Sequence, residues 1–146
     1  MTIWNSRLSW VPVLLPLALA ACGGDKSSVP KERPDLQVIS MTLDPAHPTA
    51  GEQVEVSAVV KNIGTADAPA TMSGVTVDGT QTCAVIPTLA LPILQTTTVI
   101  CSLGVLTAGN HGVGVCADVT NAADEPDESN NCILQMIEVG AGAGRK

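Results

Sequence analysis

The chain has 146 residues and carries 14 acidic against seven basic side chains, a formal net charge of −7 at pH 7. This acidic balance argues against binding to nucleic acid or to anionic lipid head groups, because either would demand a basic patch. The chain has no Phe or Tyr, and both of its Trp residues, Trp4 and Trp10, lie near the N-terminus. From residue 11 onward it therefore offers no aromatic platform on which a base or a sugar ring could stack.

Residues 1–21 have the order of a secretory signal peptide: one positive charge, an apolar run over 11–21, and small residues before Cys22. The Leu-Ala-Ala-Cys sequence that ends at Cys22 resembles a bacterial lipobox, in which the cysteine receives diacylglycerol and begins the mature chain. A transmembrane helix is the weaker interpretation, because the apolar run is about half of the roughly 20 residues needed and two prolines interrupt it. An ordinary signal peptide, cleaved nearby, is the other alternative and would leave Cys22 as a free thiol.

Lipidation of Cys22 would place the protein in the cell envelope. Two or three acyl chains, such as palmitate, anchor a protein stably, whereas one chain binds only marginally. By resemblance to Gram-negative lipoproteins, Gly23 favours sorting to the outer membrane, because an Asp at that position favours retention at the inner membrane. In a Gram-positive cell the same anchor would lie on the outer face of the plasma membrane. We therefore predict membrane contact through the lipid anchor only.

The mature chain is predicted to contain a tether, one domain and a tail. Residues 22–34 are polar and contain Gly, Ser and Pro, which is typical of a flexible spacer. Residues 140–146 contain three glycines and are expected to form a frayed tail. Residues 35–139, enough for one domain, show short β-type segments and no convincing helical period.

Seven short strands are predicted from alternating apolar residues and turn signals. The first changes phase after Val38, so a bulge or twist is expected there. Asp78-Gly79 is a hairpin-type turn. In about 105 residues, this number and spacing predict an all-β, seven-stranded sandwich of the immunoglobulin or fibronectin-III type. In chain order the strands are Leu36–Leu43, Gln53–Asn62, Met72–Val77, Thr82–Ile86, Thr96–Leu103, Val113–Val119 and Cys132–Val139.

The domain has four cysteines of its own: Cys83, Cys101, Cys116 and Cys132. No Cys-x-x-Cys pair occurs and the four are not clustered as zinc ligands are, so disulfides are favoured over a metal site. Of the three possible pairings we favour Cys83–Cys101 and Cys116–Cys132, because each joins strands that are neighbours in sequence. Cys116 and Cys132 both lie out of phase with the apolar residues, so both should face away from the core. Each bridge would close a loop of about 17 to 19 residues and stabilise the fold by about 3 kcal/mol.

Six different short motifs follow one another along the domain. These are Pro34-Asp35-Leu36, Asp44-Pro45 followed by Pro48 and Gly51, Val60–Ala68, Val77-Asp78-Gly79, Ala117-Asp118, and Glu125 followed by Glu128-Ser129-Asn130-Asn131. Together they resemble the CARDB domain, a cell-adhesion-related domain found in bacteria, over about residues 34–139. The resemblance implies a seven-stranded sandwich on envelope or secreted proteins, with a role in adhesion or interaction and without catalysis. This chain departs from many relatives in being a single copy, in lacking aromatic residues and in carrying four cysteines.

Oxygen-bearing side chains are dense between residues 118 and 131. Ca²⁺ takes 6–8 oxygen ligands, so this stretch is a candidate calcium site. The spacing is not that of an EF-hand loop, however, and such side chains also cap turns by bonding to local backbone. A structural loop is the favoured interpretation, with calcium as the alternative and no other cofactor predicted. The candidate ligands are Asp118, Asp124, Glu125, Asp127 and Glu128.

No sequence motif indicates catalysis. His47 and His111 are the only histidines, and no nucleophile elbow accompanies them. The Gly112-Val113-Gly114 sequence has neither the lysine nor the following helix of a phosphate-binding loop. We therefore predict no catalytic residues and no enzymatic activity.

The predicted function is that of a lipid-anchored binding or adhesion module of the cell envelope. Its partner would be a protein or another envelope component, bound by end loops or by strand addition to a sheet edge. One alternative is an inhibitor or accessory subunit of a secreted enzyme, with the Cys116–Cys132 bridge holding loop 121–131 in a rigid pose. Another is a structural component of an envelope assembly.

Overall fold

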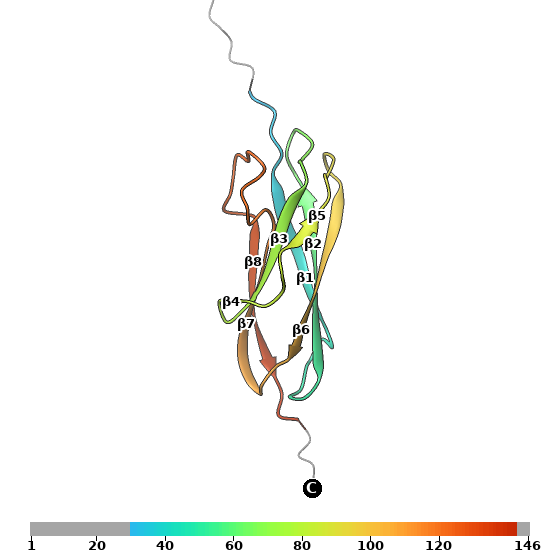
Figure 1. Cartoon of the computed structure of the whole chain (residues 1–146), viewed down its shortest axis with the longest axis vertical. Helices are drawn as coiled ribbons and strands as arrows, with labels where there is room; N and C mark the ends of the chain where they lie inside the picture. The colour runs from blue at the N-terminus through green and yellow to red at the C-terminus, as the bar shows by residue number, and fades with distance from the viewer. Residues whose placement is uncertain (1–29, 143–146) are drawn as a thin grey trace, which may run out of the picture. The chain divides into compact units, whose positions relative to one another are not determined.

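The computed structural model describes residues 30–142, and this part of the chain forms eight β-strands and no helix (Figure 1). The predicted signal peptide 1–21, the lipidation site Cys22 and residues 23–29 of the tether lie outside the described residues, as do residues 143–146. Residues 30–142 contain no helix that could span a membrane. The strands are β1 (Leu36–Asp44), β2 (Gln53–Asn62), β3 (Thr71–Val77), β4 (Thr80–Gln81), β5 (Ile86–Thr88), β6 (Thr96–Val105), β7 (Gly109–Cys116) and β8 (Cys132–Val139).

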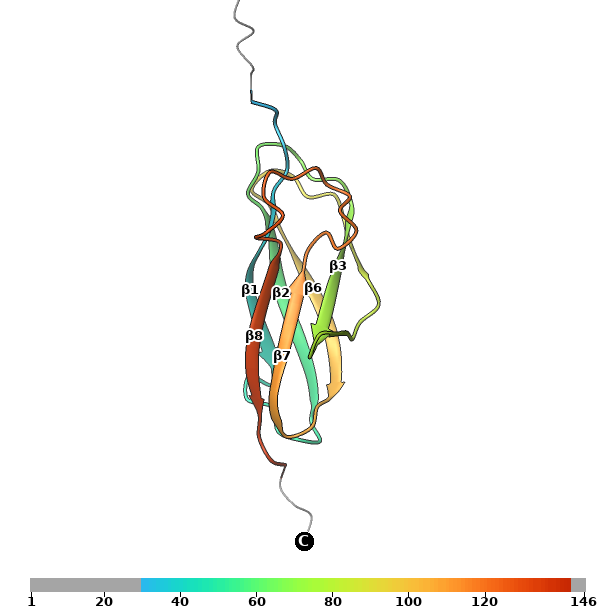
Figure 2. The ribbon, with the colours of Figure 1, turned by 90° about the vertical axis from the view of Figure 1, so that its left-hand side faces the viewer.

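The strands form two sheets that face each other as the layers of a sandwich (Figure 2). One sheet has the strand order β1-β2-β6, and the other has the order β4-β3-β7-β8 with β5 paired to β3. Every strand pair is antiparallel. This confirms the predicted all-β, immunoglobulin-like sandwich, with eight strands in place of seven.

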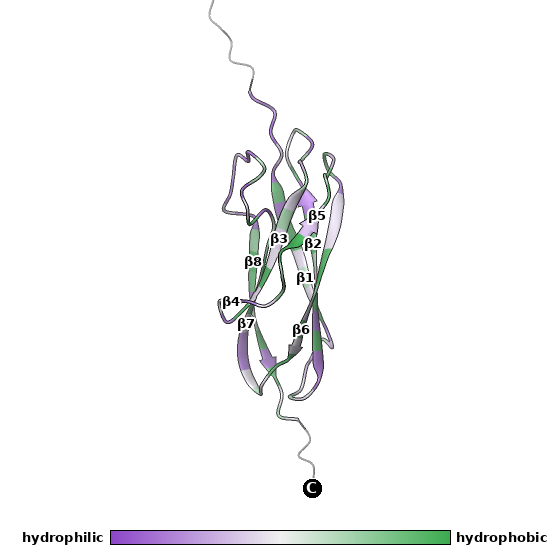
Figure 3. Cartoon of the chain, in the orientation of Figure 1, coloured by the Kyte–Doolittle hydropathy of each residue, from purple (hydrophilic) through white to green (hydrophobic). Residues whose placement is uncertain are grey.

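Small aliphatic side chains fill the space between the sheets. Along β2, Val54 and Val60 belong to an alternating set of buried residues, while the residues between them are more exposed. Hydropathy mapped on the ribbon shows hydrophobic stretches on several strands (Figure 3). Val113 and Val115 of β7 complete the opposite wall and are fully buried. Each buried valine stabilises the fold by about 1.5–3 kcal/mol, and no aromatic ring adds to this core.

Two local predictions are confirmed. In β1 the register shifts between Val38 and Ser40, so Val38 is buried and Ile39 is 46% exposed. This bulge is the expected change of phase. Asp78 and Gly79 link β3 to β4 with φ values of 51° and 77°, which are the positive values that a tight hairpin turn requires.

The predicted strand Thr82–Ile86 is wrong. The chain forms β4 before this segment and β5 at its end, and residues 82–85 are not in a strand. Cys83 explains the difference, because its disulfide to Cys101 connects this segment to the opposite sheet. The chain therefore leaves the edge of β3 and returns to it as β5, which alternation within the sequence could not reveal.

The strand predicted at Val113–Val119 has different bounds in the structure. It begins earlier, at Gly109, and ends at Cys116. Asp118 has a φ of 43°, which is outside the extended range of a β-strand. The apolar alternation therefore continues past the residue where the strand itself ends.

Residues 31–35 join the sandwich at the end formed by loops 63–70, 89–95 and 117–131, which we call the N-terminal end (Figure 1). The Arg33 carbonyl accepts hydrogen bonds from the backbone N–H groups of Thr65 (2.8 Å) and Ala66 (3.1 Å). A Cβ at Gly64 would clash with the backbone of residues 33–35, so only glycine permits this close approach. Residues 31–34 therefore belong to the compact domain, which begins at Lys31, and the predicted tether of 22–34 extended too far.

The last described residues lie at the opposite end, which we call the C-terminal end, beside loops 45–52 and 106–108 (Figures 1 and 2). The backbone of Gly140 donates to Pro48 (2.9 Å) and accepts from Ala50 (2.8 Å). Thr49 and Gly140 thereby form a short parallel bridge. The first residues of the predicted tail, 140–146, are thus held against the β1–β2 loop.

Candidate functional site

The loop from Ala117 to Asn131 contains all five predicted calcium ligands, and Asp118 is the most deeply placed of them. Its side-chain oxygens accept hydrogen bonds from the backbone N–H groups of Ala122 (2.9 Å) and Ala123 (2.7 Å). Asp118 is only 4% exposed. Because both oxygens are used by the backbone of its own loop, Asp118 holds the loop's shape.

Asp124 forms ion pairs with two basic side chains of the same chain and not with a metal ion. It pairs with Lys31 and, at 3.5 Å, with the Arg33 guanidinium. The Lys31 ammonium and then the Arg33 charge hold the pKa of Asp124 below its ordinary value. Asp124 therefore fixes the N-terminal segment to the loop.

Glu125 is 6% exposed and joins the loop to β1. Its Oε2 accepts a hydrogen bond from the backbone N–H of Leu36 at 3.0 Å. Burial is the main reason why the pKa of Glu125 is raised, and the nearby carboxylate of Glu128 adds to it. Its Oε1 is buried and has no hydrogen-bond partner among the described residues. Glu125 is thus a buried polar anchor between the loop and the first strand.

The last two predicted ligands bind groups within the loop. Asp127 accepts hydrogen bonds from the side chain and the backbone of Ser129, which lower the pKa of Asp127. Glu128 accepts from the Asn131 amide at 2.9 Å. Within residues 30–142 there is no group of three or more His, Cys, Asp or Glu that could hold a metal ion. The structure therefore does not bring the predicted calcium ligands together, because each has a different partner.

Both predicted disulfides are present. Cys116 and Cys132 are direct register partners on β7 and β8, with their Cα atoms 4.1 Å apart. This bridge closes the base of loop 117–131. Cys83 and Cys101, with Cα atoms 6.2 Å apart, connect the β4–β5 segment to β6 of the other sheet. Each loop sits in the size range where a bridge is worth about 3 kcal/mol.

His111 of β7 forms a cluster that the sequence did not reveal. Its Nδ1 lies 2.8 Å from the carboxylate of Asp78, and its Nε2 lies 2.9 Å from the carbonyl oxygen and 3.4 Å from the hydroxyl of Thr107. A hydroxyl, an imidazole and a carboxylate in this order resemble a catalytic triad. The carbonyl of Thr107, however, requires a proton on Nε2, so that nitrogen is not available as a base. The cluster is therefore a clasp between the β3–β4 turn and the β6–β7 loop.

The clasp makes stability depend on pH. Hydrogen bonds to Asp78 first, and to the Thr107 carbonyl second, raise the pKa of His111 above its ordinary value. The stabilisation is complete below the unfolded-state pKa of about 6.5 and is lost as pH rises through the higher folded-state pKa. We expect urea denaturation to show a fall in unfolding free energy from about pH 6 to about pH 9 that is smaller in His111→Gln and in Asp78→Asn. If the unfolding free energy of the wild type and of both variants changed equally with pH, the pH dependence would not come from the pair of His111 and Asp78.

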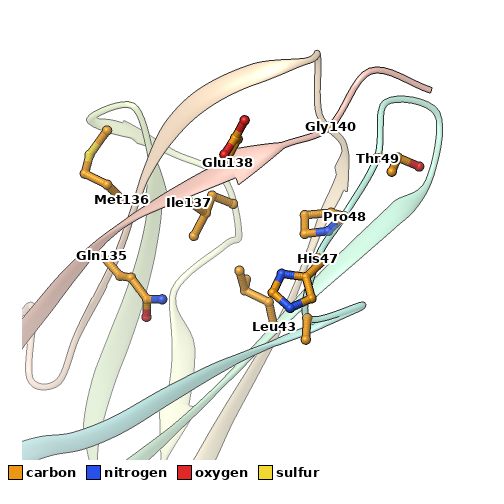
Figure 4. A pocket seen from close by; sticks show the side chains of 10 residues that line it. Leu43, His47, Pro48, Thr49, Gln135, Met136, Ile137, Glu138 and Gly140 are labelled. Carbon is orange, nitrogen blue, oxygen red and sulfur yellow. The ribbon is translucent and has the colours of Figure 1, made fainter.

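A groove of about 410 Å³ lies at the C-terminal end, between the edge strands β1 and β8 (Figure 4). On one wall, Gln135 and Ile137 of β8 point toward the groove. Leu43 of β1 and His47 of the β1–β2 loop lie across from them. The volume falls in the range of small-molecule sites, and the walls combine apolar and polar side chains. This groove is therefore a candidate binding site.

Charge is distributed unevenly between the two ends. The described residues include three Lys or Arg side chains, Lys31, Arg33 and Lys61. Lys31 and Arg33 lie at the N-terminal end, and Lys61 pairs with Gln37 near the start of β1. The C-terminal end carries no Lys or Arg within residues 30–142. Its exposed carboxylates include Asp44, Glu52, Glu55, Glu138 and Asp78, the last of which is paired with His111.

Comparison with known proteins assigns the family. The CARDB family model matches residues 33–135, so the chain belongs to the CARDB family. This is a family of non-catalytic domains of cell-surface proteins. No curated protein matches the chain.

Three solved structures share the fold. One is a crystal structure of the CARDB domain of PF1109 from Pyrococcus furiosus in complex with di-metal ions, with a TM-score of 0.64, 21% identity, and coverage of 77% of this chain and 99% of that one. A solution structure of the same domain has a TM-score of 0.61, 23% identity, and coverage of 75% and 98%. A domain of a putative cell surface protein from Methanosarcina acetivorans has a TM-score of 0.64, 25% identity, and coverage of 73% and 92%.

Proposed function

We propose that the protein is a lipid-anchored CARDB protein of the cell envelope that binds a protein or another envelope component. The observation that carries this proposal is the placement of the groove. It lies at the C-terminal end of the sandwich, whereas the segment that leads back to Cys22 joins at the N-terminal end. The groove and the residues that follow the predicted tether therefore lie at opposite ends of the domain. The proposal involves no catalysis, as expected for this family.

Metal ions are not part of this proposal. The P. furiosus domain is described with di-metal ions, but the carboxylates of loop 117–131 in this chain already bind backbone N–H groups and cations. They do not form a group that could hold a metal ion.

Substitution of Cys22 by serine tests the anchor. We expect Cys22→Ser to move the protein from the membrane fraction to the soluble fraction, because no acyl chain can then be attached. The thermal midpoint should not change, since residue 22 precedes the compact domain. Ser28→Ala, in the same tether, is the matched control and should stay with the membrane. Recovery of Cys22→Ser in the membrane pellet would refute the lipid anchor.

Capture from envelope extract tests the binding function. The Cys22→Ser chain would serve as soluble bait, beside the same bait with Gln135→Lys in the groove. We expect a partner that the groove variant loses. Retention of the partner by the groove variant would place binding elsewhere on the domain.

One observation favours an alternative role as an inhibitor of a secreted enzyme. The Cys116–Cys132 bridge and the hydrogen bonds of Asp118 hold loop 117–131 in a fixed conformation, as an inhibitory loop requires. Titration of the soluble bait against envelope proteases distinguishes this role, because inhibition would depend on the loop and not on the groove.

A further inference from the structure

We propose that the groove between β1 and β8 binds an extended, positively charged segment of a partner protein, which adds as a strand to the free edge of β8. The inference rests on the proposed binding function and specifies the chemistry of the partner. It follows from three properties of the C-terminal end: a free strand edge, a groove beside it, and an acidic rim.

The free edge belongs to β8, the last strand in the order of its sheet. Just beyond the end of β8, the backbone of Gly140 already pairs with that of Thr49, which belongs to the β1–β2 loop outside this sheet. Upstream of Gly140, residues 135–138 line the groove instead of pairing with a further strand. An extended peptide in the groove would continue the pairing along β8. Such strand addition supplies affinity through main-chain hydrogen bonds.

The groove gives that segment a place for its side chains. Leu43, Pro48 and Ile137 provide apolar contacts, and Gln135 and His47 provide polar ones (Figure 4). Side chains of an extended strand point alternately to opposite sides. An alternating peptide would therefore direct its apolar side chains into the groove and its polar side chains to the rim.

The rim determines the charge of the segment. Glu138 lines the groove, and Glu52 lies beside it because its carboxylate accepts a hydrogen bond from the backbone of Thr49 at 2.8 Å. Lysine or arginine side chains at the rim would speed the encounter.

A second copy of this chain is the less suitable occupant. Pairing of two β8 edges would bring a second set of acidic side chains to a surface that already lacks Lys and Arg within the described residues. The repulsion between them opposes a dimer through this edge.

Titration with short peptides tests the proposal. The Cys22→Ser chain would be titrated with a nine-residue peptide of alternating lysine and valine, followed by amide chemical shifts. We expect shifts at residues 135–138 and 47–49, and binding about tenfold weaker for the matching glutamate–valine peptide. N-methylation of alternate amides in the lysine peptide should weaken binding by a similar factor, because it removes main-chain donors.

Two variants and one control complete the test. Gln135→Lys and Glu138→Lys should each weaken binding of the lysine–valine peptide about tenfold, because they add positive charge at the groove. Glu32→Lys makes the same charge change as Glu138→Lys at the N-terminal end, and should change affinity by less than about twofold.

Equal binding of the N-methylated peptide would overturn strand addition, and equal binding of the glutamate peptide would overturn the cationic specificity. A dimer in sedimentation, with amide shifts at residues 135–138 that depend on protein concentration, would identify a second copy as the occupant. None of these results would refute the proposed function. That function is tested separately by envelope capture and by fractionation of Cys22→Ser, neither of which uses the peptide.

Discussion

Asn62→Ala is expected to lower the free energy of unfolding by about 4 kcal/mol, because the side chain makes four buried or part-buried hydrogen bonds worth about 1 kcal/mol each. Asn62 ends β2 and has no exposed surface. Its Oδ1 accepts from the backbone N–H groups of Gly64 (3.0 Å) and Asp35 (3.2 Å). Its amide donates to the carbonyls of Ala66 (2.8 Å) and Leu91 (2.9 Å).

The size of the effect follows from what alanine leaves behind. Four backbone groups would lose their side-chain partner where water has little access, and an unpaired buried group costs about 1–3 kcal/mol. These groups belong to the N-terminal segment, the loop after β2 and the loop before β6. One side chain therefore fixes three separate segments at the N-terminal end. A loss of this size is a large part of the 5–15 kcal/mol typical of a domain.

Urea denaturation of Asn62→Ala and Lys61→Ala measures this effect. Lys61 precedes Asn62 in β2 and faces away from the core, so its substitution should change stability by no more than about 0.5 kcal/mol. A cost below about 1 kcal/mol for Asn62→Ala would show that water replaces the lost bonds.

Local signals in the sequence predicted the local structure well. The bulge after Val38 followed from a change of apolar phase, and the turn at Asp78-Gly79 followed from the residues themselves. The strand at Thr82–Ile86 failed because the Cys83–Cys101 bridge, a contact between sheets, determines that segment. Alternation reports which face of a strand is buried, and it carries no information on a chain that crosses from one sheet to the other.

The candidate sites show the same division between local and distant contacts. The acidic residues of loop 117–131 were visible in the sequence, but their partners were not. Asp124 binds Lys31 and Arg33 from the start of the domain, and Glu125 binds the backbone of Leu36. The sequence shows which residues carry oxygen atoms, whereas the fold determines whether those atoms converge on one point.

His111 and the groove were missed for related reasons. Asp78 and His111 are 33 residues apart and meet only because β3 and β7 are paired. The groove depends on β1 and β8, the first and last strands, and on which edges the two sheets leave free. The turn at Asp78-Gly79 was the available signal for the His111 cluster. Once the order of the strands in the sheet is known, this turn must lie beside β7.

Loss of both disulfides is expected to lower the free energy of unfolding by about 6 kcal/mol, since each closes a loop worth about 3 kcal/mol in the chain-entropy model. The core is built from Val, Leu, Ile and Ala, which bury less area per residue than aromatic rings do. The covalent bridges therefore contribute a larger share of stability than in a domain with an aromatic core. In reducing buffer at 37 °C we expect a large rise in the unfolded fraction, because a loss of this size is comparable with the lower part of the 5–15 kcal/mol typical of a domain.

The two bridges are expected to contribute differently when each is removed alone. Cys116 and Cys132 lie on strands that hydrogen bonds already hold in register, so Cys116→Ala with Cys132→Ala should cost no more than the loop-closure value of about 3 kcal/mol. Cys101 is 2% exposed and belongs to the core. Cys83→Ala with Cys101→Ala should therefore cost more, because the loss of buried contacts adds to the loop-closure value. Urea denaturation of both double variants, beside the wild type with and without reductant, measures these differences. A wild-type midpoint that reductant does not change would mean that the four thiols are free in the native protein, and that the aliphatic core alone holds the two sheets together.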